Sequence, residues 1–241
     1  MIKPGELNRY NPEQYNNFTF DNDSVRKQFI AKVFSIVGFQ LLFSAAIIAV
    51  FLFNGDVKDF VIQNPYLFWV AMGAIFVTLI MIACCDTIRR TFPINYILLA
   101  VFTIAESFTL GIITLNYEVD YVILALAITA VVVFALTIFA MQTKIDFTTC
   151  GGMLLMFIVI LIIMGVVLMY FPDRVTKMAY VCFGVFCFGL YLVYDVQLMV
   201  GGSHAYAISP EEYVFAALSI YIDIINIFMY ILALFGMSND K

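Results

Sequence analysis

The stretch YVFAALSIYIDIINIFMYILALF, residues 213–235, decides the fold class, because it is 23 residues long and Asp223 is its only charged residue. A helix that crosses the hydrocarbon core of a bilayer needs about 20 mostly apolar residues. The stretch therefore predicts a transmembrane helix with one carboxyl group near its middle. An ionisable group at that depth costs roughly 2.5–3.5 kcal/mol on insertion scales, so Asp223 indicates a functional site.

The whole chain has the composition of a membrane protein. Of its 241 residues, 64% are hydrophobic and 12% are charged, and the mean hydropathy is +1.01. Soluble domains carry about 25% charged residues. Six further runs have spanning length and show no alternation of apolar and polar residues, which argues against a transmembrane barrel. These runs are Val33–Phe53, Tyr66–Cys85, Ile94–Leu115, Tyr121–Met141, Phe147–Phe171 and Met178–Met199.

We therefore expect an all-α, polytopic membrane protein built as a bundle of seven transmembrane helices. Residues 32–241 are assigned to this domain, and residues 1–31 to a short N-terminal tail. Most loops are a handful of residues, which predicts that consecutive helices are antiparallel neighbours. The stretch SVRKQFIAKVF, residues 24–34, places Val25, Phe29 and Val33 on one helical face. That spacing is typical of an interfacial amphipathic helix, here leading directly into the first span.

The distribution of Lys and Arg predicts a cytosolic N-terminus, because cytosolic flanks carry the excess of basic residues. With that orientation eight basic residues flank the cytosolic face and four flank the other. The eight are Lys3, Arg9, Arg26, Lys27, Lys32, Arg89, Arg90 and Lys144, and the four are Lys58, Arg174, Lys177 and Lys241. The sequons at Asn17 and Asn22 are then expected to remain without glycan, because only lumenal sequons are modified.

The charge balance limits the kinds of partner that we expect. The net charge is −5 and the basic residues are scattered along helix flanks, so no nucleic-acid partner is expected. Membrane lipids and calcium ions are the expected partners, with cell-death regulators or other channels as further candidates.

Three spans carry one acid each, namely Glu106, Asp195 and Asp223, and none has a basic residue at its own depth in its span. One interpretation is that each acid is protonated and helps helices to pack. The other is that facing carboxyl groups share a proton, because two of them cannot both ionise at low cost. Such a pair would sense pH and, when deprotonated, hold a cation. Glu106 is a further candidate for the wall of the ion pathway.

The cation suggested by these groups is Ca²⁺. Carboxylate oxygens suit hard ions, whereas zinc prefers His or Cys, and the only histidine, His204, is expected in a solvated loop. We expect no tightly bound cofactor, with Ca²⁺ as the permeant ion and Asp195 and Asp223 as its candidate ligands. The two aspartates lie at different distances from the helix ends that join them, which leaves an offset of roughly 7 Å.

Two features lie at the helix ends. Arg89 and Arg90 follow the second span, where one could reach the shallow Asp195; the alternative is that they serve only to orient the chain. The sequence Ser209-Pro210-Glu211-Glu212 reads as a capping box, with Ser at the N-cap, Pro at N1 and Glu at N3. The seventh helix should therefore begin near Pro210.

At these residues the sequence resembles the transmembrane Bax-inhibitor motif family and its lifeguard subgroup. The resemblance extends from Ser24 onward. The stretches that carry it are SVRKQFIAKVFSIVGFQ (24–40), RRTFPIN (89–95), YDVQLMVGG (194–202) and ISPEEYVFAALSIYIDIINIF (208–228).

This resemblance implies a seven-helix protein of the endoplasmic reticulum, Golgi or related membranes that leaks Ca²⁺ in a pH-dependent way and suppresses apoptosis. It also implies that Asp195 and Asp223 form the pH-sensing site and that Arg89 or Arg90 latches it. One departure is Val196, which stands where the subgroup usually has Thr.

Other functions fit less well. Two aspartates on consecutive helices are also found in intramembrane aspartyl proteases, but the GxGD and PAL motifs of those enzymes do not occur here. A receptor is disfavoured by the absence of DRY and NPxxY sequences. The sequence therefore predicts no enzymatic activity. The main alternative to a channel is a non-conducting membrane adaptor that binds and modulates other channels or cell-death regulators.

Overall fold

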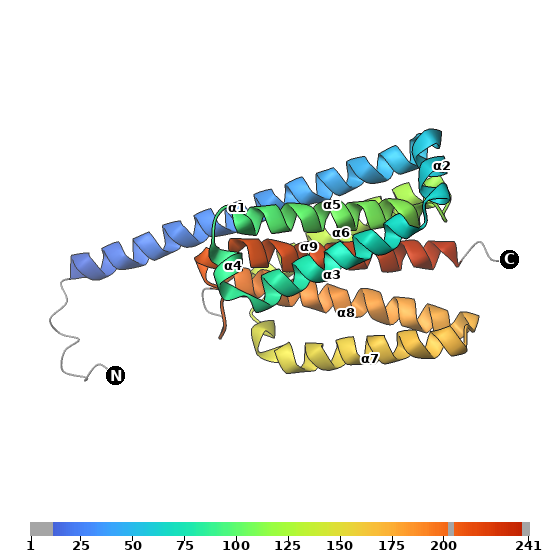
Figure 1. Ribbon diagram of the computed structural model, residues 1–241. Helices are drawn as coiled ribbons and strands as arrows, with labels where there is room; N and C mark the ends of the chain where they lie inside the picture. Colours follow the sequence, from blue (N-terminus) through green and yellow to red (C-terminus); the bar gives the residue numbers. More distant parts are fainter. Residues whose placement is uncertain (1–11, 202–204, 238–241) are drawn as a thin grey trace.

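In a computed structural model the protein is a bundle of helices, and the described residues, 12–201 and 205–237, contain no β-strand. For residues 12–23 only the backbone is described. Within these limits seven helices are long and apolar enough to cross a membrane, which confirms the predicted fold class. Figure 1 shows them side by side. His204 and the side chains of Asn17 and Asn22 lie outside the described residues.

The helices in chain order are α1 (Pro12–Phe53), α2 (Gly55–Gln63), α3 (Tyr66–Cys84), α4 (Asp86–Arg90), α5 (Ile94–Thr114), α6 (Val119–Gln142), the 3₁₀ helix η2 (Phe147–Cys150), α7 (Gly151–Tyr170), α8 (Arg174–Val200), the 3₁₀ helix η3 (Pro210–Glu212) and α9 (Tyr213–Gly236).

The two ends of the bundle differ in their polar residues. We call the end where α4 and η3 meet the arginine end, because Arg89 and Arg90 lie there. We call the other end, with α2 and the C-terminus of α9, the far end (Figure 1).

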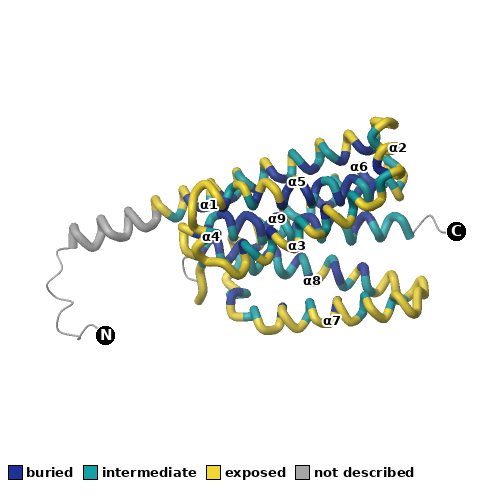
Figure 2. The backbone as a smooth tube through the Cα atoms, viewed as in Figure 1, coloured by how far each residue is buried: buried dark blue, intermediate teal, exposed yellow. Residues whose placement is uncertain are grey.

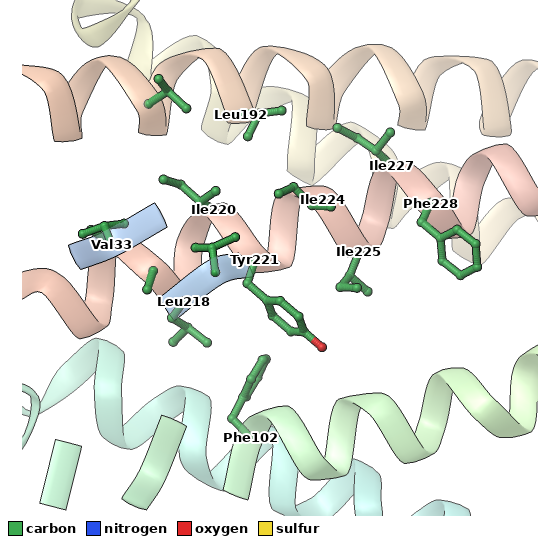
Figure 3. Packing of buried hydrophobic residues seen from close by; sticks show 14 of the residues in the cluster. Val33, Phe102, Leu192, Leu218, Ile220, Tyr221, Ile224, Ile225, Ile227 and Phe228 are labelled. Atoms are coloured by element: carbon green, nitrogen blue, oxygen red, sulfur yellow. The ribbon is translucent and has the colours of Figure 1, made fainter. Parts of the chain in front are cut away.

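The C-terminal helix α9 lies at the centre of the bundle. It packs against α8, α6, α1 and α5. Figure 3 shows Tyr221 pointing towards Phe102 of α5, while Ile227 points towards α8. The Tyr221 and Phe102 rings meet edge to face with centroids 6.2 Å apart. Because α9 is enclosed in this way, a polar side chain on it faces protein and not lipid.

The remaining spans form two groups on either side of α9. Helices α1, α3 and α5 pack together, and α8 packs between α6 and α7 (Figure 1). The prediction that all consecutive helices are neighbours is therefore only partly correct. It is right for α3 with α5 and for α7, α8 and α9. It is wrong for α1 and α3, which α5 separates, for α6 and α7, which α8 separates, and for α5 and α6, which α9 separates. The loop that connects α5 to α6 crosses the end of α9, where the Tyr117 ring lies against Gly236.

The outer surface of the bundle is apolar. Helix α7 is exposed along most of its length, as Figure 2 shows, and Leu155, Ile162 and Met169 are among its exposed side chains. Its backbone groups are paired within the helix, which is the arrangement that a lipid environment requires.

The predicted amphipathic segment is helical and continuous with the first span, because α1 runs without a break through the proposed boundary at residues 31 and 32. Its apolar face, however, is not at a lipid interface. Phe29 and Val33 belong to the core of the bundle, whereas Val25 is exposed. Arg26, a basic residue between Val25 and Phe29, holds this segment against the rest of the bundle, as described below.

Candidate functional site

The structure brings Asp195 of α8 and Asp223 of α9 together. Their carboxyl groups lie close enough to interact with each other in the interior of the bundle. The Asp223 side chain is buried, with 3% of the residue exposed, and its Oδ2 atom has no hydrogen-bond partner in the described structure. A hydrogen bond between two carboxyl groups needs a proton on at least one of them, because carboxylates have no donor. Two buried carboxyl groups at this spacing are expected to share a proton, because two adjacent negative charges repel each other.

The expected offset between the two aspartates is absent, because α9 begins beyond the level at which α8 ends. Asp195 lies six residues before Gly201, and Asp223 lies 11 residues after Glu212. Their contact requires the start of α9 to lie roughly 7 Å beyond the end of α8. The short helix η3 supplies this extension, and Glu212 at its end lies beside α4.

The arginine pair is bound to Glu212 and not to the aspartates. Arg89 Nη2 and Arg90 Nη2 each lie 2.6 Å from Glu212 Oε1, and Arg90 Nε lies 3.2 Å from the same atom. Arg89 Nη2 also lies 2.8 Å from Asp86 Oδ1. The hydrogen bond to Glu212 raises the pKa of the Arg90 guanidinium above its ordinary value, so this arginine remains charged. The idea that either arginine touches Asp195 is not supported by this structure.

This ion pair also changes the expected capping box. Ser209 does act as the N-cap, since its Oγ accepts a hydrogen bond from the Glu211 backbone N–H at 3.5 Å, and Pro210 takes the first helical position. Glu212, however, does not return to the Ser209 N–H as a capping box requires. Its carboxylate is bound by two guanidinium groups, which are stronger donors because the hydrogen bonds are charge-assisted.

Glu106 lies apart from the aspartate pair. It faces a cavity of about 390 Å³ that is also lined by Thr109 of α5 and Asn226 of α9. Among the described residues, no hydrogen bond or ion pair joins the Glu106 carboxyl group to Asp195 or Asp223. The proposed pH-sensing pair and the proposed pore-wall acid are thus two separate features of the bundle.

Arg26 is a further polar contact that sequence reasoning assigned only to topology. Its guanidinium donates to the backbone oxygens of Val200, Ile208 and Leu198 at 2.9, 2.7 and 3.0 Å. It therefore satisfies the C-terminal carbonyls of α8, which have no partner within the helix. A cation at this end of a helix also interacts favourably with the helix dipole. Nothing in the local sequence around Arg26 identifies these partners.

A chain of side-chain hydrogen bonds joins α1, α5 and α9 beside the core. Gln40 Nε2 donates to Thr103 Oγ1 at 2.8 Å. The Ser44 hydroxyl lies 2.8 Å from both the Ser107 hydroxyl and the Tyr221 hydroxyl. Every member is buried. Buried polar groups of this kind fix the relative position of the helices, because each would be costly to leave unpaired.

The aspartate pair does not resemble a tight metal site. The described residues contain no group of three or more His, Cys, Asp or Glu side chains that could hold a metal ion. Ca²⁺ takes six to eight oxygen ligands, and two carboxylates supply only part of that set.

The family described as "Inhibitor of apoptosis-promoting Bax1" matches residues 26–240, nearly the whole chain. The chain belongs to this Bax-inhibitor family. Bax-inhibitor proteins are membrane proteins and not enzymes, so the predicted family and the predicted lack of enzymatic activity are both confirmed.

Three relatives place the chain within the Bax-inhibitor family. Protein lifeguard 3 of Homo sapiens is 43% identical over 224 residues, which cover 91% of this chain and 72% of that protein. Protein lifeguard 3 of Mus musculus is 40% identical over 235 residues, covering 96% and 76%. The Golgi anti-apoptotic protein of Vaccinia virus (strain Lister) is 33% identical over 217 residues, covering 90% and 88%.

Proposed function

We propose that this protein is a pH-sensitive calcium leak channel of intracellular membranes that suppresses apoptosis. The observation that carries the proposal is the close approach of the Asp195 and Asp223 carboxyl groups in the interior of a seven-span bundle. Acids at this depth in a membrane have a high energetic cost, and such residues typically mark functional sites.

We assign the protonated form of the aspartate pair to the closed state of the channel. Removing the shared proton breaks the hydrogen bond and leaves two negative charges on α8 and α9 in a medium where charges are poorly screened. The two helices then repel each other at this point. The separated carboxylates become oxygen ligands for a divalent cation. The leak should therefore be low at acidic pH and increase as the pH rises through the titration of the pair.

The arginine end is proposed to face the cytosol. The excess of basic residues on that side supports this orientation, and it places the aspartate pair in the cytosolic half of the membrane. In this arrangement the Arg89–Glu212 and Arg90–Glu212 contacts hold the start of α9 and restrain its separation from the bundle. The arginines would thus latch the closed state through Glu212.

The cellular role is proposed from the relatives. One relative is named a Golgi anti-apoptotic protein, and the matching family is described as an inhibitor of apoptosis-promoting Bax1. We infer that this protein restrains cell death and resides in Golgi or related endomembranes. A steady leak of stored Ca²⁺ would connect the two roles, because it lowers the Ca²⁺ available for release.

Calcium flux from liposomes tests this function. Purified protein is reconstituted into liposomes that hold Ca²⁺ at neutral pH, and release is followed with an external indicator. The proposal predicts release by the protein alone, at a rate that depends on the amount reconstituted. The variant Asp59→Asn serves as a control, because Asp59 is exposed on α2. Liposomes that stay sealed at every protein density would contradict a channel and favour a non-conducting adaptor.

A further inference from the structure

A cavity in the half of the bundle nearer the far end contains the carboxyl group of Glu106. This Glu106 cavity, of about 390 Å³, is lined by residues of α3, α5, α8 and α9. In the described structure the Glu106 side chain makes no hydrogen bond or ion pair. Leaving a carboxylate unpaired in an apolar surrounding is costly. The arrangement is stable at low cost only if the carboxyl group is protonated, or if water or a cation occupies the cavity.

A second side-chain oxygen that could bind a cation faces the Glu106 cavity. Asn226 of α9 donates its Nδ2 to the Ile222 backbone oxygen at 2.8 Å, which leaves Oδ1 free to accept. Asn226 follows Asp223 by three residues, so the two lie on the same side of α9 with a rise of roughly 4.5 Å between them. An ion bound at Glu106 and Asn226 would therefore be one helical turn from the aspartate pair.

The Glu106 cavity continues towards the far end of the bundle. A neighbouring cavity of about 380 Å³ is lined there by Asn116, Lys177 and Gly236, and we call it the outer cavity. The two cavities share three wall residues. These shared residues are Tyr180, Val181 and Ala233. The cavities thus form one route from the far end of the bundle to Glu106, interrupted where their walls meet.

Two tyrosines stand at this boundary. The Tyr230 hydroxyl donates to the Tyr180 hydroxyl at 3.2 Å, and the two rings meet edge to face. The position of Tyr230 depends on Gly184 of α8, because a Cβ atom there would lie 2.5 Å from Tyr230 Cε1. Only a glycine allows the tyrosine ring to pack this close to the helix backbone. The pair is therefore held in a defined position between the two cavities.

We propose that the Glu106 cavity is a hydrated vestibule that binds a divalent cation through Glu106 and Asn226, and that the Tyr180–Tyr230 pair closes it towards the far end. This inference rests on the proposed leak and extends it. The channel would have a second closure, at the opposite side of the membrane from the arginines, and a cation store next to the aspartate pair. Because protein supplies two ligands and Ca²⁺ takes six to eight, the ion would keep most of its water.

Cysteine accessibility tests the vestibule without measuring flux. Asn226→Cys is placed in the full-length protein after replacement of the native cysteines Cys84, Cys85, Cys150, Cys182 and Cys187. Reconstituted protein is treated from the far-end side with membrane-impermeant methanethiosulfonates, one cationic and one anionic. Two matched controls lie at nearby positions: Ile227→Cys at a buried core site and Ile104→Cys at an exposed, outward-facing site.

The vestibule predicts that the Asn226→Cys thiol reacts and that the two controls do not, since the reagent reaches only thiols that contact water. The cationic reagent should react at least about tenfold faster than the anionic one, because a unit charge about 4 Å away shifts the two rates in opposite directions even at the dielectric constant of water. Glu106→Gln should remove most of that difference. An unreactive thiol, equal rates with both reagents, or reaction from the arginine end alone would each overturn the proposal.

The tyrosine closure has its own comparison in the same assay. Tyr230→Phe removes the hydroxyl that bridges to Tyr180 and should speed labelling of the Asn226→Cys thiol several-fold. Tyr170→Phe, at an exposed site on α7, should leave the labelling rate unchanged. An unchanged rate for Tyr230→Phe would refute the closure. Labelling as predicted in liposomes that pass no Ca²⁺ would refute the leak and leave the vestibule in place, so the two failures are distinguishable.

Discussion

Arg89 donates a 2.6 Å hydrogen bond to Glu212, and this contact fixes the start of α9 to the short helix α4. The two side chains are mostly buried, at 15% and 12% exposed. Arg90 binds the same carboxylate oxygen from the solvent side. The central helix of the bundle is thus held at its first turn by a cluster of charges, while Asp223 lies three turns further along it.

Replacing Glu212 should weaken the bundle measurably. Glu212→Gln removes the negative charge that two guanidinium groups share, and hydrogen bonds to charged groups contribute about 1.5–3 kcal/mol each. We expect a loss of about 1.5–3 kcal/mol in the free energy of unfolding, measured by denaturant titration in detergent. If the cluster is also a latch, the leak of this variant at acidic pH should exceed that of the wild type.

The neighbouring glutamate supplies the control. Glu211 is 75% exposed, and its carboxylate lies 4.0 Å from Arg90. An exposed pair of this kind contributes about 0–1 kcal/mol, so Glu211→Gln should change stability little. Equal stability losses for the two variants would mean that the Arg89–Glu212 contact does not hold α9.

A second prediction concerns the end of α8. Gly201 has φ of +62°, a conformation that favours glycine, and a Cβ atom added there would lie 2.8 Å from Arg26 Cζ. Gly201→Ala therefore adds backbone strain and displaces the arginine from the α8 carbonyls. We expect a loss of about 1–3 kcal/mol in the free energy of unfolding.

Gly73→Ala is the matched substitution for that experiment. Gly73 lies in α3 and has no atom within 4 Å of its added Cβ. Alanine is favoured over glycine inside a helix by about 0.8–1.0 kcal/mol, so this variant should be as stable as the wild type or slightly more so. Hydrogen exchange near residues 198–201 should increase only in Gly201→Ala.

The orientation of the chain can be tested with glycan. The native sequons at Asn17 and Asn22 should remain unmodified when the protein is made with endoplasmic reticulum microsomes, because the N-terminus is proposed to be cytosolic. A flexible segment with one sequon, added after Lys241, should be glycosylated and shift in gel mobility. Modification at Asn17 or Asn22, together with an unmodified C-terminal sequon, would reverse the proposed topology.

The spans were predictable because each transmembrane helix must by itself be long and apolar enough to cross the bilayer. A run such as Tyr213–Phe235 needs no knowledge of its neighbours to be assigned as a helix, since length and hydropathy suffice. The packing order was not predictable in this way. Lipid and protein are similarly apolar, so the sequence of α5 does not reveal that α9 separates it from α6.

The candidate site was predictable in part for the same reason. Asp195 and Asp223 are conspicuous because each is a lone charge in an apolar run, and the structure brings them into contact. The partner of Arg89 and Arg90 was missed, because Glu212 was assigned to a capping box by its spacing from Ser209. Local spacing predicts local hydrogen bonds, but a charge from a distant helix competes for the same carboxylate.

The pH dependence of the calcium leak tests the central claim most directly. Initial release rates from liposomes are measured between pH 5.5 and pH 8 for the wild type, Asp195→Asn, Asp223→Asn and the control Asp59→Asn. An asparagine keeps the size and a donor but cannot titrate. We predict that the wild type and Asp59→Asn leak faster as the pH rises, by up to about tenfold per unit for a single proton, and that both site variants stay flat. Wild-type profiles in both Asp195→Asn and Asp223→Asn would contradict the account.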